Sequence, residues 1–127
     1  MTSKPSILHH LALGARDVEA VAEFYRDIFE LAETARHLYD HGELRSIWLD
    51  MGGTLLMVEH TEAPNKQVDG VGAGPFLLAF DVAGPTERRE LEARLEQRGI
   101  EIEERTDFSS YFRDPEGNRV AVSHYPR

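Results

Sequence analysis

The sequence predicts an α+β protein built from two tandem modules, each a strand followed by a helix and three further strands. Residues 18–28 and 85–98 repeat apolar side chains at helical spacing, and several segments around them alternate apolar and polar residues as strands do. An internal repeat is the third observation, because five apolar positions recur at a constant offset of 67 residues (78 − 11). The matching positions are Leu11-Ala12-Leu13 with Leu78-Ala79-Phe80, Phe24 with Leu91, and Ile28 with Leu95. We therefore expect a single domain over the whole chain, with modules at about residues 6–61 and 74–125 and a linker at 62–73.

The first module is predicted to begin with a strand at residues 7–13 and a helix that ends near Leu31. Asp17 is the expected N-cap, because its carboxylate can accept an unpaired backbone N–H of the first turn. One apolar stripe should pack this helix into the core: Val18, Val21, Phe24, Tyr25 and Ile28. Three shorter strands should follow, and these lie at residues 32–39, 44–51 and 54–60. Gly52-Gly53 suits a tight turn between the last two, since glycine tolerates a positive φ.

The second module is predicted to contain a strand at residues 75–82, a helix, a strand at 100–106 and a closing hairpin. Pro85 suits the first helical position, and Gly99 suits the residue that ends the helix. The hairpin is centred on Asp114-Pro115-Glu116-Gly117. This sequence favours a type I turn, with Asp capping the first corner and Pro setting φ at the second.

Composition and charge exclude several classes of protein. The net charge of −9 argues against a nucleic-acid partner, whose phosphates would be repelled. No apolar run is long enough to span a membrane. The chain has no cysteine, so it has neither a disulfide framework nor a thiolate nucleophile or metal ligand. These features lead us to expect a cytoplasmic protein whose metal ligands or catalytic bases, if any, come from histidine and carboxylate side chains.

Two motifs at opposite ends of the chain carry a family resemblance. Tyr111-Phe112 runs into Asp114-Pro115-Glu116-Gly117-Asn118, and residues 8–13 read Leu-His-His-Leu-Ala-Leu. Together they resemble the vicinal oxygen chelate superfamily, which includes glyoxalase-type lyases, bleomycin-resistance proteins, fosfomycin-resistance enzymes and extradiol dioxygenases. The resemblance covers nearly the whole chain. It implies curled mixed sheets with the helices outside, a concave cleft that binds a small molecule, and a homodimer.

The resemblance also implies where a divalent metal would be held, with one ligand from each of four strands. In chain order these positions fall on His10, Glu59, Leu77 and Ala121. Ala121 lies four residues after Gly117, and the same count from Gly53 reaches Met57 instead of Glu59. The second position therefore stays open between Glu59 and Met57. Leucine and alanine cannot coordinate a metal, which needs several converging nitrogen and oxygen ligands. We expect an incomplete site limited to His10 and Glu59, with a metal cofactor only if other residues complete it.

Alternation along the strands predicts a cavity-facing set that is mostly apolar. This set is Leu8, His10, Ala12, Leu55, Met57, Glu59, Leu77, Ala79, Ala121 and Ser123. Aromatic side chains, among them Trp48 and Tyr111, are candidates for the pocket walls because flat ligands stack on them. The residues that we expect to contact a ligand are Leu55, Met57, Trp48, Leu77, Tyr111, Ala121 and Ser123.

The other five histidines are expected to lie outside the cavity. His9 should face the helix or the rim in a structural role. His37 and His41 flank a turn and should be solvated. His60 and His124 end their strands on the opposite face, by alternation, from the cavity-facing positions.

Three functions, besides a purely structural or interaction role, remain open on these grounds. The first is a bleomycin-resistance type of protein that binds a small, largely apolar molecule beside a degenerate metal site. The second is a metal-dependent lyase, isomerase or dioxygenase of the same superfamily. The third is a metal-free acid–base enzyme in which Glu59 orients His10 as a general base. The sequence does not specify the substrate.

Overall fold

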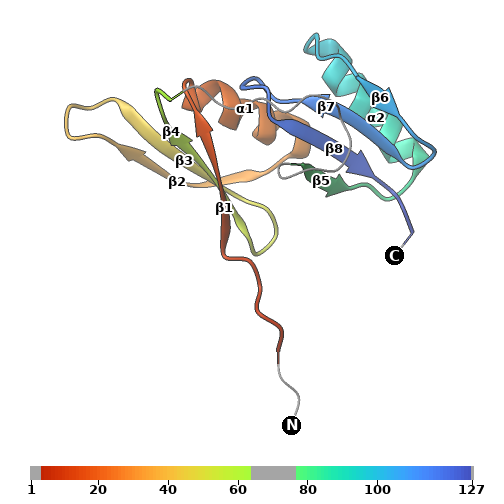
Figure 1. Ribbon diagram of the computed structural model, residues 1–127, viewed down its shortest axis with the longest axis horizontal. Helices are drawn as coiled ribbons and strands as arrows, with labels where there is room; N and C mark the ends of the chain where they lie inside the picture. The colour runs from red at the N-terminus through yellow and green to blue at the C-terminus, as the bar shows by residue number, and fades with distance from the viewer. Residues whose placement is uncertain (1–3, 64–76, 127) are drawn as a thin grey trace. The chain divides into compact units, whose positions relative to one another are not determined.

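The computed structural model describes residues 4–63 and 77–126. Each of these ranges forms a compact unit with one four-stranded sheet and one helix. In both units the first strand pairs in parallel with the last, and the other neighbouring strands are antiparallel (Figure 1). The predicted α+β class and the repeated order of strand, helix and three strands are therefore confirmed. The predicted linker at residues 62–73 lies mostly outside the described residues.

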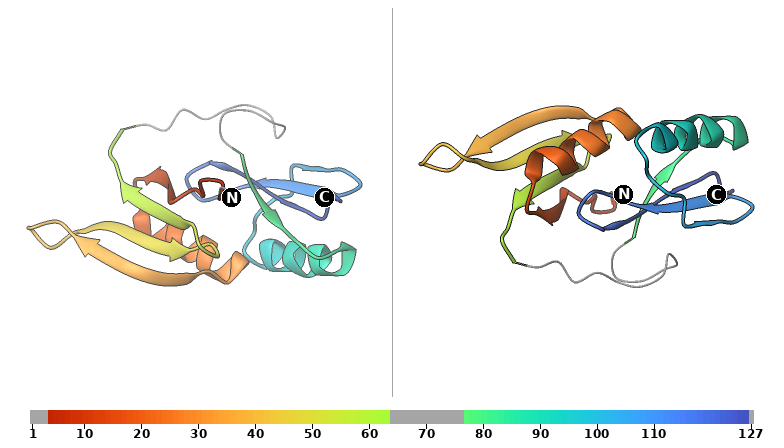
Figure 2. Two further views of the ribbon diagram at one scale, coloured as in Figure 1. Left: turned by 90° about the horizontal axis from the view of Figure 1, so that it is seen from below. Right: turned by 90° about the horizontal axis from the view of Figure 1, so that it is seen from above.

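The N-terminal unit has the spatial strand order β1-β4-β3-β2. Its elements are β1 (His10–Ala15), α1 (Val18–Phe29), β2 (Ala32–Leu38), β3 (Leu44–Asp50) and β4 (Leu55–His60). Helix α1 packs along one face of this sheet, against β3 and β4 (Figure 2). The predicted apolar stripe of α1 is buried there, together with Ile47, Leu49, Leu56 and Val58 from the sheet.

Local sequence sets the boundaries of α1 and of the turn between β3 and β4. The Asp17 side chain accepts the backbone N–H of Ala20 at 3.0 Å, which confirms the predicted N-cap. The predicted tight turn is also present, since Gly52 and Gly53 both have positive φ. Asp50 stabilises it by accepting both glycine N–H groups through Oδ1, at 2.8 and 3.1 Å.

The C-terminal unit repeats this plan with the strand order β5-β8-β7-β6. Its elements are β5 (Leu78–Asp81), α2 (Pro85–Gln97), β6 (Glu104–Arg105), β7 (Ser109–Arg113) and β8 (Arg119–Ser123). The predicted hairpin turn joins β7 to β8. Its corner is held by Asp114, whose Oδ1 accepts the N–H groups of Glu116 and Asn118, both at 2.9 Å. The carboxylate therefore fixes the turn as the sequence predicts.

Two predicted strands are shorter or shifted in the structure. The strand expected at residues 7–13 begins only at His10, because its partner β4 begins at Leu55 and the residues before His10 have no strand beside them. The strand expected at 100–106 is reduced to β6, two charged residues at the edge of its sheet. An edge strand has one neighbour and gains little from burial, so its length is weakly determined.

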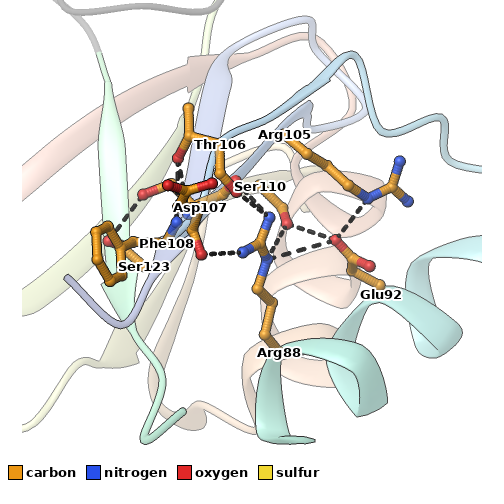
Figure 3. A network of polar contacts seen from close by, with 9 residues as sticks. Arg88, Glu92, Arg105, Thr106, Asp107, Phe108, Ser110 and Ser123 are labelled. Atoms are coloured by element: carbon orange, nitrogen blue, oxygen red, sulfur yellow. Dashed lines mark hydrogen bonds and ion pairs between the residues drawn. The ribbon is translucent and has the colours of Figure 1, made fainter. Parts of the chain in front are cut away.

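Helix α2 depends on polar contacts more than α1 does. Only Leu91 and Leu95 are buried on α2, whereas six residues are buried on α1. Arg88 on α2 compensates by reaching the segment that leads into β7 (Figure 3). Its guanidinium donates to Ser110 Oγ at 2.8 Å and to three backbone carbonyl oxygens, those of Asp107, Thr106 and Ser109, at 3.1, 2.9 and 2.7 Å. One side chain thus connects α2 to four acceptors in this segment.

Glu92, one turn further along α2, belongs to the same group of contacts. We call this group, Arg88, Glu92, Arg105 and Ser110, the polar clamp. Its carboxylate accepts hydrogen bonds from Ser110 Oγ and from Arg105 Nε (Figure 3). Burial alone would raise the pKa of Glu92, but the hydrogen bonds from Ser110 and Arg105 and the charges of Arg105 and Arg88 outweigh it. The pKa of Glu92 therefore lies below its ordinary value of 4.5. The ionised carboxylate is the form that the folded unit favours.

The lowered pKa of Glu92 predicts how the free energy of unfolding changes at acid pH. A group whose pKa is lower in the folded state contributes stability above its unfolded pKa, and this contribution is lost as the pH falls through the folded value. We expect Glu92→Gln to lower the free energy of unfolding at neutral pH and to weaken its decrease below pH 4.5. Denaturant unfolding over this pH range measures both effects. Glu90→Gln, at an exposed position of the same helix, is the control; identical curves for the two variants would contradict the clamp.

Candidate functional site

The open face of the N-terminal sheet is the face opposite α1. Leu56 and Val58 of β4 are fully buried on the helix side, so by alternation Leu55, Met57 and Glu59 point the other way. Strand register lines these residues up in rows across the sheet. The central row contains Ala12, Met57, Trp48 and Ala35, from β1, β4, β3 and β2. It is an apolar strip in which Met57 is only 7% exposed.

Register separates the two predicted catalytic residues, His10 and Glu59. His10 lies opposite Leu55, whereas Glu59 lies opposite Gly14. The two side chains share a face but are four residues apart along paired strands, roughly 13 Å at about 3.3 Å per residue. Instead, the Nδ1 atom of His10 lies 2.9 Å from Nδ1 of His9. The structure therefore does not bring His10 and Glu59 together as a hydrogen-bonded pair.

Register also bears on the second metal-ligand position, which the sequence leaves between Glu59 and Met57. Ala12 pairs with Met57 in the first sheet, and Ala79 pairs with Ala121 in the second. Ala12 and Ala79 are related by the internal repeat of 67 residues (79 − 12). Met57 is therefore the equivalent of Ala121, and Glu59 lies one row away from that position.

His37 is a further residue of the open face. It was expected to be solvated, but its ring packs on Trp48 with the ring centroids 4.6 Å apart. His37 Nε2 and Trp48 Nε1 are both buried without a hydrogen-bond partner in the described part of the chain. Register places His37 in the row of Ser46 and Glu59. Residues two apart on a strand share a face, and Ala35, two residues before His37, is half-buried. This spacing is the signal in the sequence that could have placed His37 on the open face.

In the C-terminal unit, the predicted contact residues line the corresponding sheet face. Tyr111 pairs with Ala121, which is only 2% exposed, and Ser109 pairs with Ser123 through hydroxyl groups 2.8 Å apart. Leu77 is half-buried and immediately precedes β5. A hollow of about 270 Å³ lies beside β5, lined by Ala79, Phe80, Asp81, Ser123, Tyr125 and Pro126. Of the predicted contact residues in this unit, Ser123 alone reaches the hollow.

Within residues 4–63 and 77–126, no three histidine, aspartate or glutamate side chains converge as the ligands of a metal ion. His124 lies against the ring of Phe108, with the centroids 5.5 Å apart. His60 is hydrogen-bonded to Tyr39 and Glu62, away from the rows of the open face. Neither α1 nor α2, the helices of the described residues, is long and apolar enough to cross a membrane.

Known structures with the same fold include enzymes and integron proteins. A lactoylglutathione lyase from Agrobacterium tumefaciens is 26% identical to the chain, with a TM-score of 0.69 and 95% of each chain covered. The fosfomycin resistance protein FosX from Listeria monocytogenes, solved with Mn(II) and 1S,2S-dihydroxypropylphosphonic acid, has a TM-score of 0.80 at 18% identity over 97% of this chain and 95% of its own. An integron cassette protein from V. cholerae has a TM-score of 0.68 at 24% identity, over 99% and 100% of the two chains.

Among curated proteins, none matches the chain. The model of one protein family, however, matches residues 7–122, which is nearly the whole chain. This match agrees with the motifs at the two ends of the chain and with the repeated module of strand, helix and three strands. The chain belongs to the Glyoxalase/Bleomycin resistance protein/Dioxygenase superfamily.

Proposed function

We propose that the chain binds a small, largely apolar molecule on the open face of the N-terminal sheet. The observation that carries this proposal is the apolar row of Ala12, Met57 and Trp48 across that face. An indole and a thioether offer a flat, polarisable surface for an aromatic ligand. Ala12 is exposed and Trp48 is half-buried, so solvent, and hence a ligand, can reach the row.

The residues present do not fit the divalent metal that the superfamily resemblance implies. Of the four equivalent positions, His10 carries a nitrogen donor, while the other three carry Met57, Leu77 and Ala121. A thioether is a soft ligand suited to Cu(I), and the alkyl side chains donate nothing. One imidazole holds a divalent ion only weakly. We therefore propose binding without a metal at these positions, in preference to the metal-dependent lyase or dioxygenase alternative.

Polar atoms beside the apolar row narrow the ligand class. The Trp48 indole N–H can only donate, and it has no acceptor among the described residues. A ligand with a carbonyl or ether oxygen would supply the acceptor that this N–H lacks. The Glu59 carboxylate and the net charge of −9 favour neutral or cationic molecules over anions. We infer an aromatic ligand that is neutral or cationic and carries an acceptor oxygen.

Ligand binding is tested with Nile red, a neutral aromatic dye with a carbonyl oxygen. Wild-type protein should increase the dye fluorescence, and the dye should quench Trp48, the only tryptophan. We expect Trp48→Ala to raise the dissociation constant about tenfold, which corresponds to roughly 1.4 kcal/mol of lost stacking. A chelator should leave the wild-type affinity unchanged.

Tyr125→Ala is the matched control, because Tyr125 lines the hollow of the C-terminal unit. Its affinity for the dye should equal that of the wild type. If Tyr125→Ala weakens binding and Trp48→Ala does not, the ligand binds to the hollow and the proposed face is wrong. Stoichiometric zinc, nickel, manganese or iron in the purified protein, together with loss of binding on chelation, would support the metal-dependent alternative instead.

The acid–base alternative requires coupling between His10 and Glu59, which lie in different rows of the sheet. Their separation of roughly 13 Å exceeds the Debye length of about 8 Å at physiological salt. We expect diethyl pyrocarbonate to modify His10 equally fast in wild type and in Glu59→Gln, as measured by peptide mass spectrometry. His9→Gln should alter that rate, because His9 Nδ1 contacts His10 Nδ1. A slower reaction of His10 in Glu59→Gln would instead support the acid–base alternative, in which Glu59 orients His10.

We also propose the homodimer that the resemblance implies. Ile7 and Leu8, just before the edge strand β1, are large apolar residues that are 79% and 56% exposed. An apolar segment at a sheet edge is a surface that another chain can cover. We expect wild-type protein to sediment as a dimer and Leu8→Glu to shift it toward monomer. Leu38→Glu, at an equally exposed position of the other edge strand, should remain dimeric; a monomeric wild type would refute the proposal.

A further inference from the structure

A chain of hydrogen bonds joins Tyr39, His60 and Glu62 at the end of the N-terminal sheet. Tyr39 directly follows β2, and His60 is the last residue of β4. The Tyr39 hydroxyl lies 2.9 Å from His60 Nδ1, and His60 Nε2 lies 2.7 Å from a carboxylate oxygen of Glu62. An oxygen nucleophile, an imidazole and a carboxylate are therefore connected in sequence. This connectivity is the general signature of an activated nucleophile.

The carboxylate decides which ring nitrogen of His60 carries the proton. An ionised carboxylate only accepts hydrogen bonds, so His60 Nε2 must be the donor to Glu62. In the neutral imidazole Nδ1 is then the acceptor, and the Tyr39 hydroxyl donates to it. The imidazole is thus in the tautomer that can remove the phenol proton. Glu62 orients the ring and stabilises the imidazolium that forms.

Tyr39 is held by its neighbours, whereas His60 and Glu62 are reachable from solution. The backbone of Tyr39 is held by the β2–β3 hairpin, since its N–H donates to the carbonyl of Glu43 at 2.8 Å and its carbonyl accepts the N–H of Gly42 at 2.9 Å. The ring of Tyr39 stacks on His41 at 5.1 Å between centroids. The side chain of His60 is 21% exposed and that of Glu62 is 81% exposed. Tyr39 is half-buried, so a reagent in solution can approach a phenol whose orientation is already set.

This cluster is separate from the proposed ligand site. His60 follows Leu56 and Val58 at alternate positions of β4, so it points to the opposite face from Glu59 and Met57. Nothing in the proposed binding of an apolar molecule uses its imidazole. Chemistry at Tyr39, His60 and Glu62 is therefore independent of ligand binding at the open face.

We propose that Tyr39 is an acyl acceptor that reacts with activated carboxylic esters. The phenol proton moves to His60 Nδ1 while the phenol oxygen attacks the ester carbonyl carbon. A new aryl ester bond forms on Tyr39, the bond from the carbonyl carbon to the leaving group breaks, and the proton follows the leaving alcohol or phenol. The products are O-acyl Tyr39 and one equivalent of the free alcohol, with no oxidation or reduction.

The test uses p-nitrophenyl acetate on the full-length protein, with the acetylation of each tyrosine followed by peptide mass spectrometry. Tyr125 is an internal control, since it is 66% exposed and has no hydrogen bond from its hydroxyl to a histidine among the described residues. General-base assistance is worth about a hundredfold or more in enzymes, and we expect Tyr39 to acetylate at least about tenfold faster than Tyr125. This comparison within one chain requires no variant to fold.

Variants of His60 and Glu62 distinguish an activated Tyr39 phenol from one that is merely exposed. His60→Gln should reduce the rate at Tyr39 to that at Tyr125 and leave the rate at Tyr125 unchanged. Glu62→Gln should give an intermediate rate, because the amide oxygen still accepts from Nε2 without a charge to stabilise the imidazolium. Equal rates at Tyr39 and Tyr125 in the wild type would overturn the proposal. An unchanged rate at Tyr39 in folded His60→Gln, with folding checked by circular dichroism, would overturn it as well.

Discussion

The parallel pairing of the first and last strands of each module is the constraint on which the rest of the structure depends. In the N-terminal unit β1 pairs with β4, so α1 and the β2–β3 hairpin both lie in the connection between two parallel neighbours. Parallel neighbours need a long crossover, which a helix supplies. Once the pairing is fixed, alternation decides which residues contact α1 and which face away from it. The composition of the open face is a direct consequence.

Local chemistry explains why much of this fold could be predicted from the sequence. Asp17 and Asp114 act within a few residues of their own positions, so their roles as helix cap and turn cap are visible without any tertiary information. The repeat of 67 residues likewise reports that one plan is used twice. The start of β1 and the length of β6 are not local properties. They depend on where the neighbouring strand begins and on whether an edge is covered, which the residues themselves do not state.

The candidate site shows the same division between local and non-local information. Alternation correctly assigns Leu55, Met57 and Glu59 to one side of β4, because it needs only the strand itself. The distance between His10 and Glu59 depends on the register with β1, and this is a property of two strands. His37 was missed because β2 is an edge strand whose role depends on the contact between its residues and Trp48 on β3. The sequence therefore predicts on which side of the sheet a residue lies better than which residues of neighbouring strands lie side by side.

Strand β4 illustrates how one register can serve two chemistries. Glu59 and His60 are adjacent, so alternation sends the first to the open face and the second to the other side. His60 lies opposite Ala15, and Glu59 lies opposite Gly14, so small residues of β1 leave room beside both. A shift of one residue between β1 and β4 would exchange the faces, exposing Leu56 and Val58 and burying Glu59. The cost of exposing these two core side chains, about 1.5–3 kcal/mol each, opposes that shift. The apolar core around α1 therefore keeps the Trp48 row and the His60 imidazole on opposite faces of the sheet.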